Sequence, residues 1–434
     1  MVDRTRSRWC LRGNWHKGVL AIGLSLVLGG SVTVASAPVE ISYMSWYTGE
    51  TDALEQTVIA RFNELNPDIR VVKIGGDPRQ KLLTMIAGGA PPDVSIVNGV
   101  TQPHHLADVA MDITAHVQRA KVDMKAYLPG LEQTVSRKGR IYGLPWGFGF
   151  FNMMINVSMF ENAGLSLPQP KWTLDDMARA ARSLTRDTTG DGQPDVYGLN
   201  PGFIDVEEPL FMAHGASIVD PTTGRTDVHA PAYVDAVQYV ADLINTERIA
   251  STNVFGAANR RMAFTAGRYG MTGEWQSALN WFVAQRTHET FDWAMVYWPV
   301  GRGPQTTLGW GHTVSVIKGT PHPDEATRFV LFWADWETES RLADSGVYPQ
   351  TLRGLQTMVR KLNLPSRYSA QQVMGPLLNL PARPFVPPFE VPGYVEARDV
   401  IRPALVSAVQ GQAPAKQLFE EVRARVDALL SGGK

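Results

Sequence analysis

Cysteine is almost missing from this sequence. The single cysteine, Cys10, precedes the apolar run that begins at Val19. A disulfide needs two cysteines and a thiolate metal site needs several, so the chain after this run holds neither, and it holds no nucleophilic cysteine. Because Cys10 lies upstream of the apolar run, it is not placed to carry a lipid anchor.

An excess of charge of either sign is also missing. The chain has 41 lysines and arginines against 42 aspartates and glutamates. A protein that binds nucleic acid usually carries a strong basic excess or a basic stripe, so we expect no nucleic-acid partner. The hydrophobic fraction of 44% is typical of a globular chain. With 434 residues, two domains or two lobes are expected.

Apolar runs long enough to enter a membrane are missing from the sequence except near the N-terminus. Five basic residues, from Arg4 to Lys17, lead into the apolar run from Val19 to Val34, and Ala35-Ser36-Ala37 follows. This order predicts a secretory signal peptide, residues 1–37, and the alternative is an uncleaved membrane anchor. Removal of these residues leaves 36 basic and 41 acidic residues. We therefore expect a soluble periplasmic protein, exported and not lipid-anchored.

The first part of the exported chain alternates between strand and helix patterns. Strands are predicted at 40–46, 69–74 and 93–97, and helices at 52–66 and 80–87. A β-α-β-α-β run of this kind favours a parallel sheet covered by helices. Ligand-facing loops then lie at the carboxyl ends of the strands.

The remaining patterns continue this α/β organisation. An extended, glycine-punctuated segment at 141–156 is suited to a strand that leaves one lobe for another. The prolines of 365–392 predict a surface traverse. Further helices are expected at 172–184, 232–245, 323–336 and within 394–430, and a further strand at 308–317.

Five motifs in order carry a family resemblance. They are LTMIAGGAPPDVSIVNG at 83–99, the aromatic segment at 139–165, the Trp-led helix and acidic loop at 171–199, MAFTAGRYGMTGEWQ at 262–276, and the helical segment at 322–351. Together they resemble the family 1 extracellular solute-binding proteins of ABC importers, the group that includes maltose-binding and glycerol-3-phosphate-binding proteins.

The resemblance implies an α/β, two-lobed periplasmic binding protein fold of type II. Each lobe would hold a mostly parallel sheet flanked by helices, with the ligand cleft between the lobes. Lobe 1 would comprise 38–148 plus 312–349, and lobe 2 would comprise 149–311 plus 350–434. The implied protein is a monomer that needs no cofactor, is not an enzyme, and delivers its ligand to the membrane subunits of an ABC permease.

Candidate ligand-binding residues are aromatic rings and short polar groups in these loops. Rings cover the C–H faces of a sugar, and polar groups bind its hydroxyls. The competing interpretation is that the tryptophans lie in the core and the charged residues are solvated. The candidates are Trp46, Glu50, Asp77, Arg79, Asn98, Gln102, Trp146, Trp275, Gly309, Trp310 and His312, with Glu207 and Glu208 as further polar residues.

The acidic run from Asp187 to Asp195 resembles the start of a calcium loop. A complete loop needs a bidentate glutamate where Gly198 stands. A structural turn is therefore favoured over a calcium site. The pairs His104-His105 and His288-Glu289 lack the i,i+4 spacing of a helical zinc site. We expect no metal.

The sequence favours a neutral carbohydrate ligand, from a monosaccharide to a trisaccharide, or a polyol. A phosphorylated polyol or glycerophosphodiester is the first alternative, because an anion prefers arginine, and Arg79, Arg353, Arg383 and Arg398 are available. An exported carbohydrate-active enzyme is the second alternative. The chain has no G-x-S-x-G or H-E-x-x-H motif, which disfavours a serine hydrolase and a zinc hydrolase.

Overall fold

The computed structural model describes residues 37–47, 49–97, 106–202, 209–218, 228, 230–251, 257–276, 278–303, 305, 307–344, 349–361 and 393–431. The chain divides into two units, Met1–Ala37 and Pro38–Lys434, and all elements below belong to the second. The predicted signal peptide, except its last residue, and the proline-rich span 365–392 lie outside the described residues.

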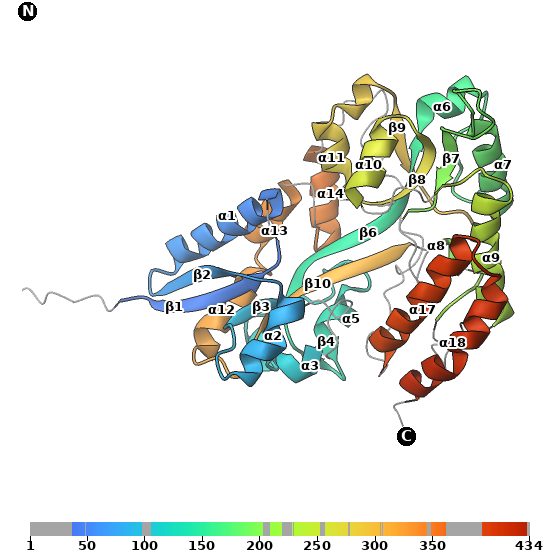
Figure 1. Cartoon of the computed structure of the whole chain (residues 1–434). Helices are drawn as coiled ribbons and strands as arrows, with labels where there is room; N and C mark the ends of the chain where they lie inside the picture. The colour runs from blue at the N-terminus through green and yellow to red at the C-terminus, as the bar shows by residue number, and fades with distance from the viewer. Residues whose placement is uncertain are drawn as a thin grey trace, which may run out of the picture. The chain divides into compact units, whose positions relative to one another are not determined.

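One mixed sheet runs through the described part of the chain (Figure 1). Its strand order is β2-β1-β3-β10-β6-β8-β7, and β9 also pairs with β6. The strands are β1 (Val39–Ser45), β2 (Ile69–Gly75), β3 (Val94–Val97), β6 (Leu144–Asn156), β7 (Tyr197–Asn200), β8 (Tyr269–Trp275), β9 (Trp293–Val296) and β10 (Leu308–Val316); β4 (Ser136–Arg137) and β5 (Arg140–Ile141) form a separate pair.

The direction of the strands differs between the ends and the middle of the sheet. Strand β1 is parallel to β2 and β3, as the β-α-β pattern predicts, and β7 is also parallel to β8. In the middle, β10 is antiparallel to β3 and β6, and β6 is antiparallel to β8 and β9. The prediction of a mostly parallel sheet in each lobe is therefore wrong for the middle of the sheet. There, β6 and β10 are antiparallel to each other and to the strands on either side of them.

The helices connect and cover these strands. Helices α1 (Gly49–Leu65) and α2 (Pro78–Ala87) make the predicted crossovers between parallel strands. The others are α3 (Leu106–Val109), α4 (Thr114–Arg119), α5 (Leu131–Val135), α6 (Val157–Asn162), α7 (Leu174–Leu184), α8 (Pro209–Ala213), α9 (Pro231–Asn245), α10 (Ala257–Thr265), α11 (Ala278–Ala284), α12 (Pro323–Phe332), α13 (Trp336–Asp344), α14 (Leu352–Lys361), α17 (Tyr394–Val409) and α18 (Ala415–Leu430), with the 3-10 turn η1 (Thr287–Glu289).

The helix predicted at 323–336 is two helices. Helix α12 ends at Phe332 and α13 begins at Trp336. The side chain of Asp335 accepts a hydrogen bond from the backbone N–H of Glu337 at 2.6 Å, which satisfies a donor of the new first turn. The apolar pattern continues through the break, so periodicity alone does not reveal it.

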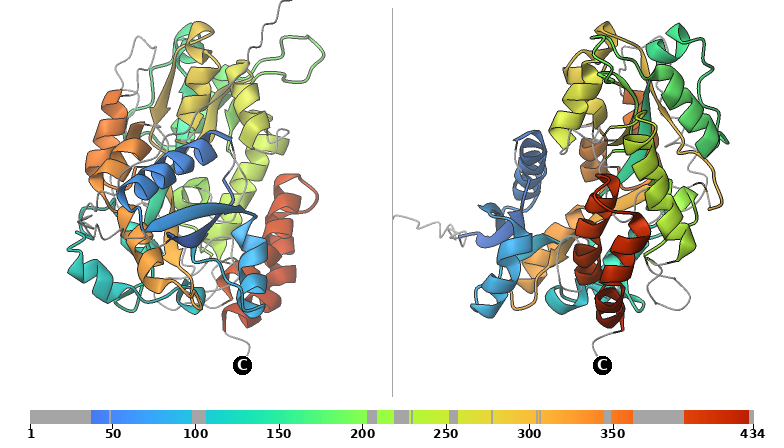
Figure 2. Two further views of the ribbon diagram at one scale, coloured as in Figure 1. Left: turned by 90° about the vertical axis from the view of Figure 1, so that its left-hand side faces the viewer. Right: turned by 45° about the vertical axis from the view of Figure 1, so that its right-hand side comes forward.

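Separate cores support the two ends of the sheet. Strands β1, β2 and β3 pack with α1 and α12 around Tyr43, Phe62 and Phe329. Another core joins β6 and β8 to α7, α9, α17 and α18. Helices α17 and α18 (red) lie beside α9, which Figure 2 shows in both views. Among the described residues, no helix combines the length and apolar character that crossing a membrane requires.

Strand β6 is buried along all of its thirteen residues. It pairs with β10 over Leu308 to Val314. A side chain at Gly311 of β10 would bring its Cβ within 2.9 Å of side-chain atoms of Thr134 and Leu131, so glycine lets α5 pack against the strand. These two strands carry Trp146, Trp310 and His312.

Candidate functional site

Four aromatic side chains meet where β1 ends. Trp46 and Tyr47 directly follow β1, Trp146 lies in β6 and His312 lies in β10. The rings of Tyr47 and Trp146 are stacked with centroids 4.6 Å apart, and His312 lies 5.3 Å from Trp46. We call these four residues the aromatic group. Trp46 and Tyr47 keep part of their surface exposed, whereas Trp146 is fully buried.

Strand register explains why residues far apart in sequence meet here. Strands β1 and β3 are parallel, so their carboxyl ends share one edge. Thr313 of β10 pairs with Val97 at the end of β3, which places His312 just beyond that edge. The register between β10 and β6 shifts at His312, which leaves Trp146 as an extra residue of β6. Bulges of this kind re-aim side chains beside binding sites.

His312 is a neutral histidine. Burial lowers the pKa of its imidazole from 6.5 to about 3, because a charged ring loses its hydration among the aromatic side chains. At neutral pH this histidine therefore contributes a polar but uncharged ring to the aromatic group.

A buried ion pair lies directly beneath Tyr47. The ammonium group of Lys73 donates to the carboxylates of Asp52 at 2.5 Å and Glu55 at 2.6 Å, and to the backbone carbonyl of Tyr47 at 3.0 Å. Glu55 also accepts hydrogen bonds from the hydroxyls of Tyr43 at 2.7 Å and Ser45 at 3.0 Å. We call Lys73 and its two carboxylate partners the Lys73 network.

Sequence reasoning missed the Lys73 network, although the pattern contains a signal for it. Lys73 continues the apolar alternation of Ile69 and Val71 in β2, and Glu55 shares the helical stripe of Val58 and Phe62 in α1. Each charge thus stands where an apolar residue is expected. A charge at a core position is costly unless it is paired, so the two together predict a contact.

Trp275 ends β8, on another part of the same sheet. Its ring lies 5.3 Å from Phe151 of β6, and it is partly exposed. The preceding residue, Glu274, is fully buried and accepts from the guanidinium of Arg260 at 2.7 Å and of Arg261 at 3.1 Å. The ion pair fixes the end of the strand from which Trp275 projects.

The other predicted residues are placed as follows. Gly309 and Trp310 lie in β10 opposite Phe150 and Gly149. Asp77 precedes α2, where its carbonyl accepts from the N–H of Lys81 at 3.0 Å. The side chains of Glu50, Arg79 and Trp310 lie outside the described residues, as do Asn98, Gln102, Glu207 and Glu208 entirely. The structure thus brings together Trp46, Trp146 and His312 from the predicted set.

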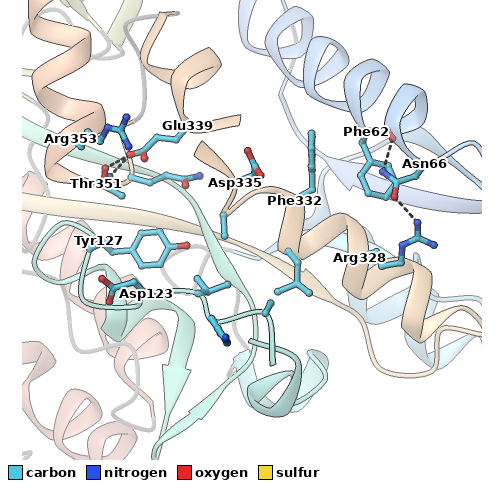
Figure 3. A pocket seen from close by; sticks show the side chains of 17 residues that line it. Phe62, Asn66, Asp123, Tyr127, Arg328, Phe332, Asp335, Glu339, Thr351 and Arg353 are labelled. Carbon is cyan, nitrogen blue, oxygen red and sulfur yellow. Dashed lines mark hydrogen bonds between the residues drawn. The ribbon is translucent and has the colours of Figure 1, made fainter. Parts of the chain in front are cut away.

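A cavity of about 670 Å³ is lined by none of the four residues of the aromatic group (Figure 3). The end of α1, the segment 120–127, the end of α12 and the start of α14 line it, and of the residues considered in the sequence analysis it includes Arg353 but none of the aromatic candidates. Two of its charged groups have partners within the protein: Arg328 donates to Asp68 at 2.6 Å, and Glu339 accepts from the N–H of Thr351 at 2.7 Å. A substitution in this cavity can therefore serve as a control for substitutions at the aromatic candidates.

The carboxylates of Asp187 and Asp195 accept hydrogen bonds from backbone N–H groups of their own loop. Asp187 accepts from the backbone N–H groups of Gly190 at 2.6 Å and Gly192 at 2.7 Å, and these bonds lower its pKa. Asp195 accepts from the N–H of Thr188 at 2.7 Å. These bonds favour the structural turn predicted above. Among the described residues, no three histidine, cysteine, aspartate or glutamate side chains gather in a way that could hold a metal ion.

Comparison with known proteins defines the class of this protein. The family model described as bacterial extracellular solute-binding protein matches residues 47–336, which is more than half of the chain. The chain therefore belongs to this family, as the order of motifs predicts. It is a bacterial solute-binding protein.

Individual relatives are distant but cover much of the chain. A probable ABC transporter-binding protein of Deinococcus radiodurans is 24% identical over 296 residues, which span 64% of this chain and 67% of that protein. An ABC substrate-binding protein from Listeria monocytogenes in complex with cycloalternan has a TM-score of 0.74 at 19% identity, covering 91% of this chain and 99% of that one.

The solved structure of UgpB from Mycobacterium tuberculosis, in complex with glycerophosphocholine, has a TM-score of 0.72 at 17% identity, covering 92% of this chain and 99% of that one. At such identities the structural likeness establishes the fold and not the ligand. It confirms the predicted fold class, the two-lobed α/β fold of periplasmic binding proteins.

Proposed function

We propose that this protein is the periplasmic substrate-binding component of an ABC importer and that it binds a small carbohydrate. The observation that carries the proposal is the aromatic group, where the partly exposed ring of Tyr47 stacks on the buried Trp146 and the partly exposed ring of Trp46 lies beside Tyr47 and His312. Such a platform suits the C–H face of a sugar ring. The N-terminal 37 residues would direct export, and the mature protein would act as a monomer without a cofactor.

Binding would proceed by closure of two lobes, 38–148 plus 312–349 and 149–311 plus 350–434. The ligand would first contact one lobe, and the second lobe would add its contacts on closing, with Trp275 and Trp310 as its aromatic candidates. Only contacts that the open form lacks can shift the population toward the closed form. A membrane permease would then recognise the closed protein.

A phosphorylated polyol or glycerophosphodiester is the second candidate ligand. Its support is the similarity to UgpB, whose structure holds glycerophosphocholine. A neutral sugar remains the first choice because the aromatic group presents rings and an uncharged histidine.

The test is a thermal-shift screen of residues 38–434 with maltose, maltotriose, trehalose, sn-glycerol 3-phosphate and glycerophosphocholine. Ligand at about 100 times its dissociation constant should stabilise the protein by about 2.7 kcal/mol. We expect a neutral sugar to raise the midpoint. A response to the phosphate compounds alone would instead support the second candidate, and no response to either class would contradict both.

Two variants locate the site of the compound that binds. Trp275→Ala should weaken its binding by about tenfold or more, because an aromatic anchor contributes well over 1 kcal/mol. Phe332→Ala, which alters the cavity of Figure 3, should leave the affinity unchanged. The reverse pattern would place the ligand in that cavity and would remove the aromatic candidates from the site.

A further inference from the structure

We propose that Lys73 is a positioning residue, which fixes the Trp46–Tyr47 segment in the conformation that binds ligand; this inference rests on the proposed function. Lys73 lies beneath the segment in β2 and does not belong to the aromatic group itself. Its role would be exerted through the backbone of Tyr47.

The backbone of Tyr47 is held on both sides. Its carbonyl accepts from the ammonium of Lys73 at 3.0 Å, and its N–H donates to the hydroxyl of Ser45 at 3.2 Å. The same hydroxyl of Ser45 donates to Glu55, the ion-pair partner of Lys73. The side-chain ring of Tyr47 is stacked on Trp146. Backbone and ring of Tyr47 are thus both fixed, and Trp46 directly precedes Tyr47 in the chain.

Lys73 uses all its donors in this arrangement. An ammonium group has three N–H bonds, and the three acceptors are Tyr47, Asp52 and Glu55. Two of them are carboxylates that hold the cation at the start of α1, and the third is the carbonyl of the binding segment. The ion pair therefore serves as a fixed anchor for one neutral backbone group.

Stability alone does not account for this anchor. Lys73 is 9% exposed and Glu55 is fully buried, so both lose hydration on folding. A buried ion pair is often no more stabilising than a well-packed neutral pair of similar volume. Both residues occupy positions where an apolar residue would extend the core of Val58, Phe62 and Val71. An apolar pair could not donate the hydrogen bond to the carbonyl of Tyr47.

The test variant is Glu55→Gln combined with Lys73→Met. Glutamine still offers an oxygen to Tyr43 and Ser45, and methionine fills the volume of lysine without its charge, so no unpaired charge is left in the core. The matched control is Lys318→Met, because Lys318 also donates to a backbone carbonyl, that of Ala107 at 2.6 Å, but at another place in the fold.

The first measurement needs no ligand. In protein labelled with 5-fluorotryptophan, the ¹⁹F resonance of Trp46 is assigned by its loss in Trp46→Phe. We expect this resonance to shift or broaden in the double variant and to stay in place in the control, while both variants unfold at similar urea concentrations. An unchanged Trp46 resonance in a folded double variant would overturn the positioning role, whatever the ligand of the protein is.

The second measurement is the affinity for the strongest binder among maltose, maltotriose, trehalose, sn-glycerol 3-phosphate and glycerophosphocholine. The double variant should bind it about tenfold more weakly, the loss expected when a charge-assisted hydrogen bond no longer holds a binding segment. Equal affinity in the double variant, despite a moved Trp46 resonance, would also overturn the proposal. If none of these compounds binds, the proposed function fails and the fluorine result still decides whether Lys73 positions the segment.

Discussion

His312 shows how one residue can link the aromatic group to pH. The sequence identifies it as a loop histidine at a strand end, and its register in β10 brings it to 5.3 Å from Trp46 and 6.0 Å from Trp146. What the sequence does not reveal is its burial, because the neighbouring rings come from segments more than 150 residues away in the chain. Burial is the cause of its low pKa.

This low pKa predicts a loss of stability in mild acid. Between about pH 6.5 and pH 3 the unfolded chain binds a proton at this histidine that the folded chain does not bind. The free energy of unfolding should therefore fall as the pH drops from about 7.5 to 5, above the range in which carboxylates titrate. In His312→Gln the fall should be smaller, as urea titrations at several pH values can show.

The free energy of unfolding of His312→Gln should still depend on pH, although less steeply than that of the wild type. Burial also lowers the pKa of His214, which contributes with the same sign. His322→Gln is the control, because His322 precedes α12 and lies outside the aromatic group. If His312→Gln and wild type had the same pH slope, His312 would not be buried as described.

The Lys73 network could not be predicted from single residues, because it depends on a contact between α1 and β2. Glu55 lies on the same face of α1 as Val58 and Phe62, and apolar periodicity alone does not single it out. The charge is informative because it breaks the pattern, and its partner Lys73 breaks the pattern of β2. Such local conflicts with the fold are expected at functional sites.

At the scale of elements, most of the fold follows from periodicity and breaks. The predicted strands at 40–46, 69–74, 93–97 and 308–317 and the predicted helices at 172–184 and 232–245 are confirmed within two or three residues at each end. Helix α7 has a capping box, with Thr173 and Asp176 bonded to each other's backbone N–H, so its start is encoded locally. The direction of β6 and β10 is not encoded locally, and the sequence did not predict it.

The 187–195 loop yields a prediction at this scale. Because Asp187 and Asp195 accept hydrogen bonds from N–H groups of their own loop, we expect the thermal midpoint in millimolar CaCl₂ to equal that in MgCl₂ at the same ionic strength. Asp187→Ala should lower the midpoint in both salts, since it removes the acceptor for Gly190 and Gly192. A rise specific to calcium, lost in this variant, would show that the loop is a calcium site.

At the scale of the whole molecule, composition and motif order predicted the class correctly. The low cysteine content, the balanced charge and the five ordered motifs led to an extracellular solute-binding protein, and the family match to residues 47–336 bears this out. The ligand could not be predicted in the same way. Ligand identity depends on a few side chains at strand ends, and several of the candidates, such as Asn98 and Gln102, lie outside the described residues.

The central claim is that ligand binding closes the protein. Its most direct test is small-angle X-ray scattering of residues 38–434, measured without ligand and with a saturating amount of the compound identified in the thermal-shift screen. If the lobes close, the radius of gyration should decrease on binding, and Trp275→Ala should need more ligand for the same decrease. A radius that stays the same with the site fully occupied would contradict closure and would describe a rigid receptor instead.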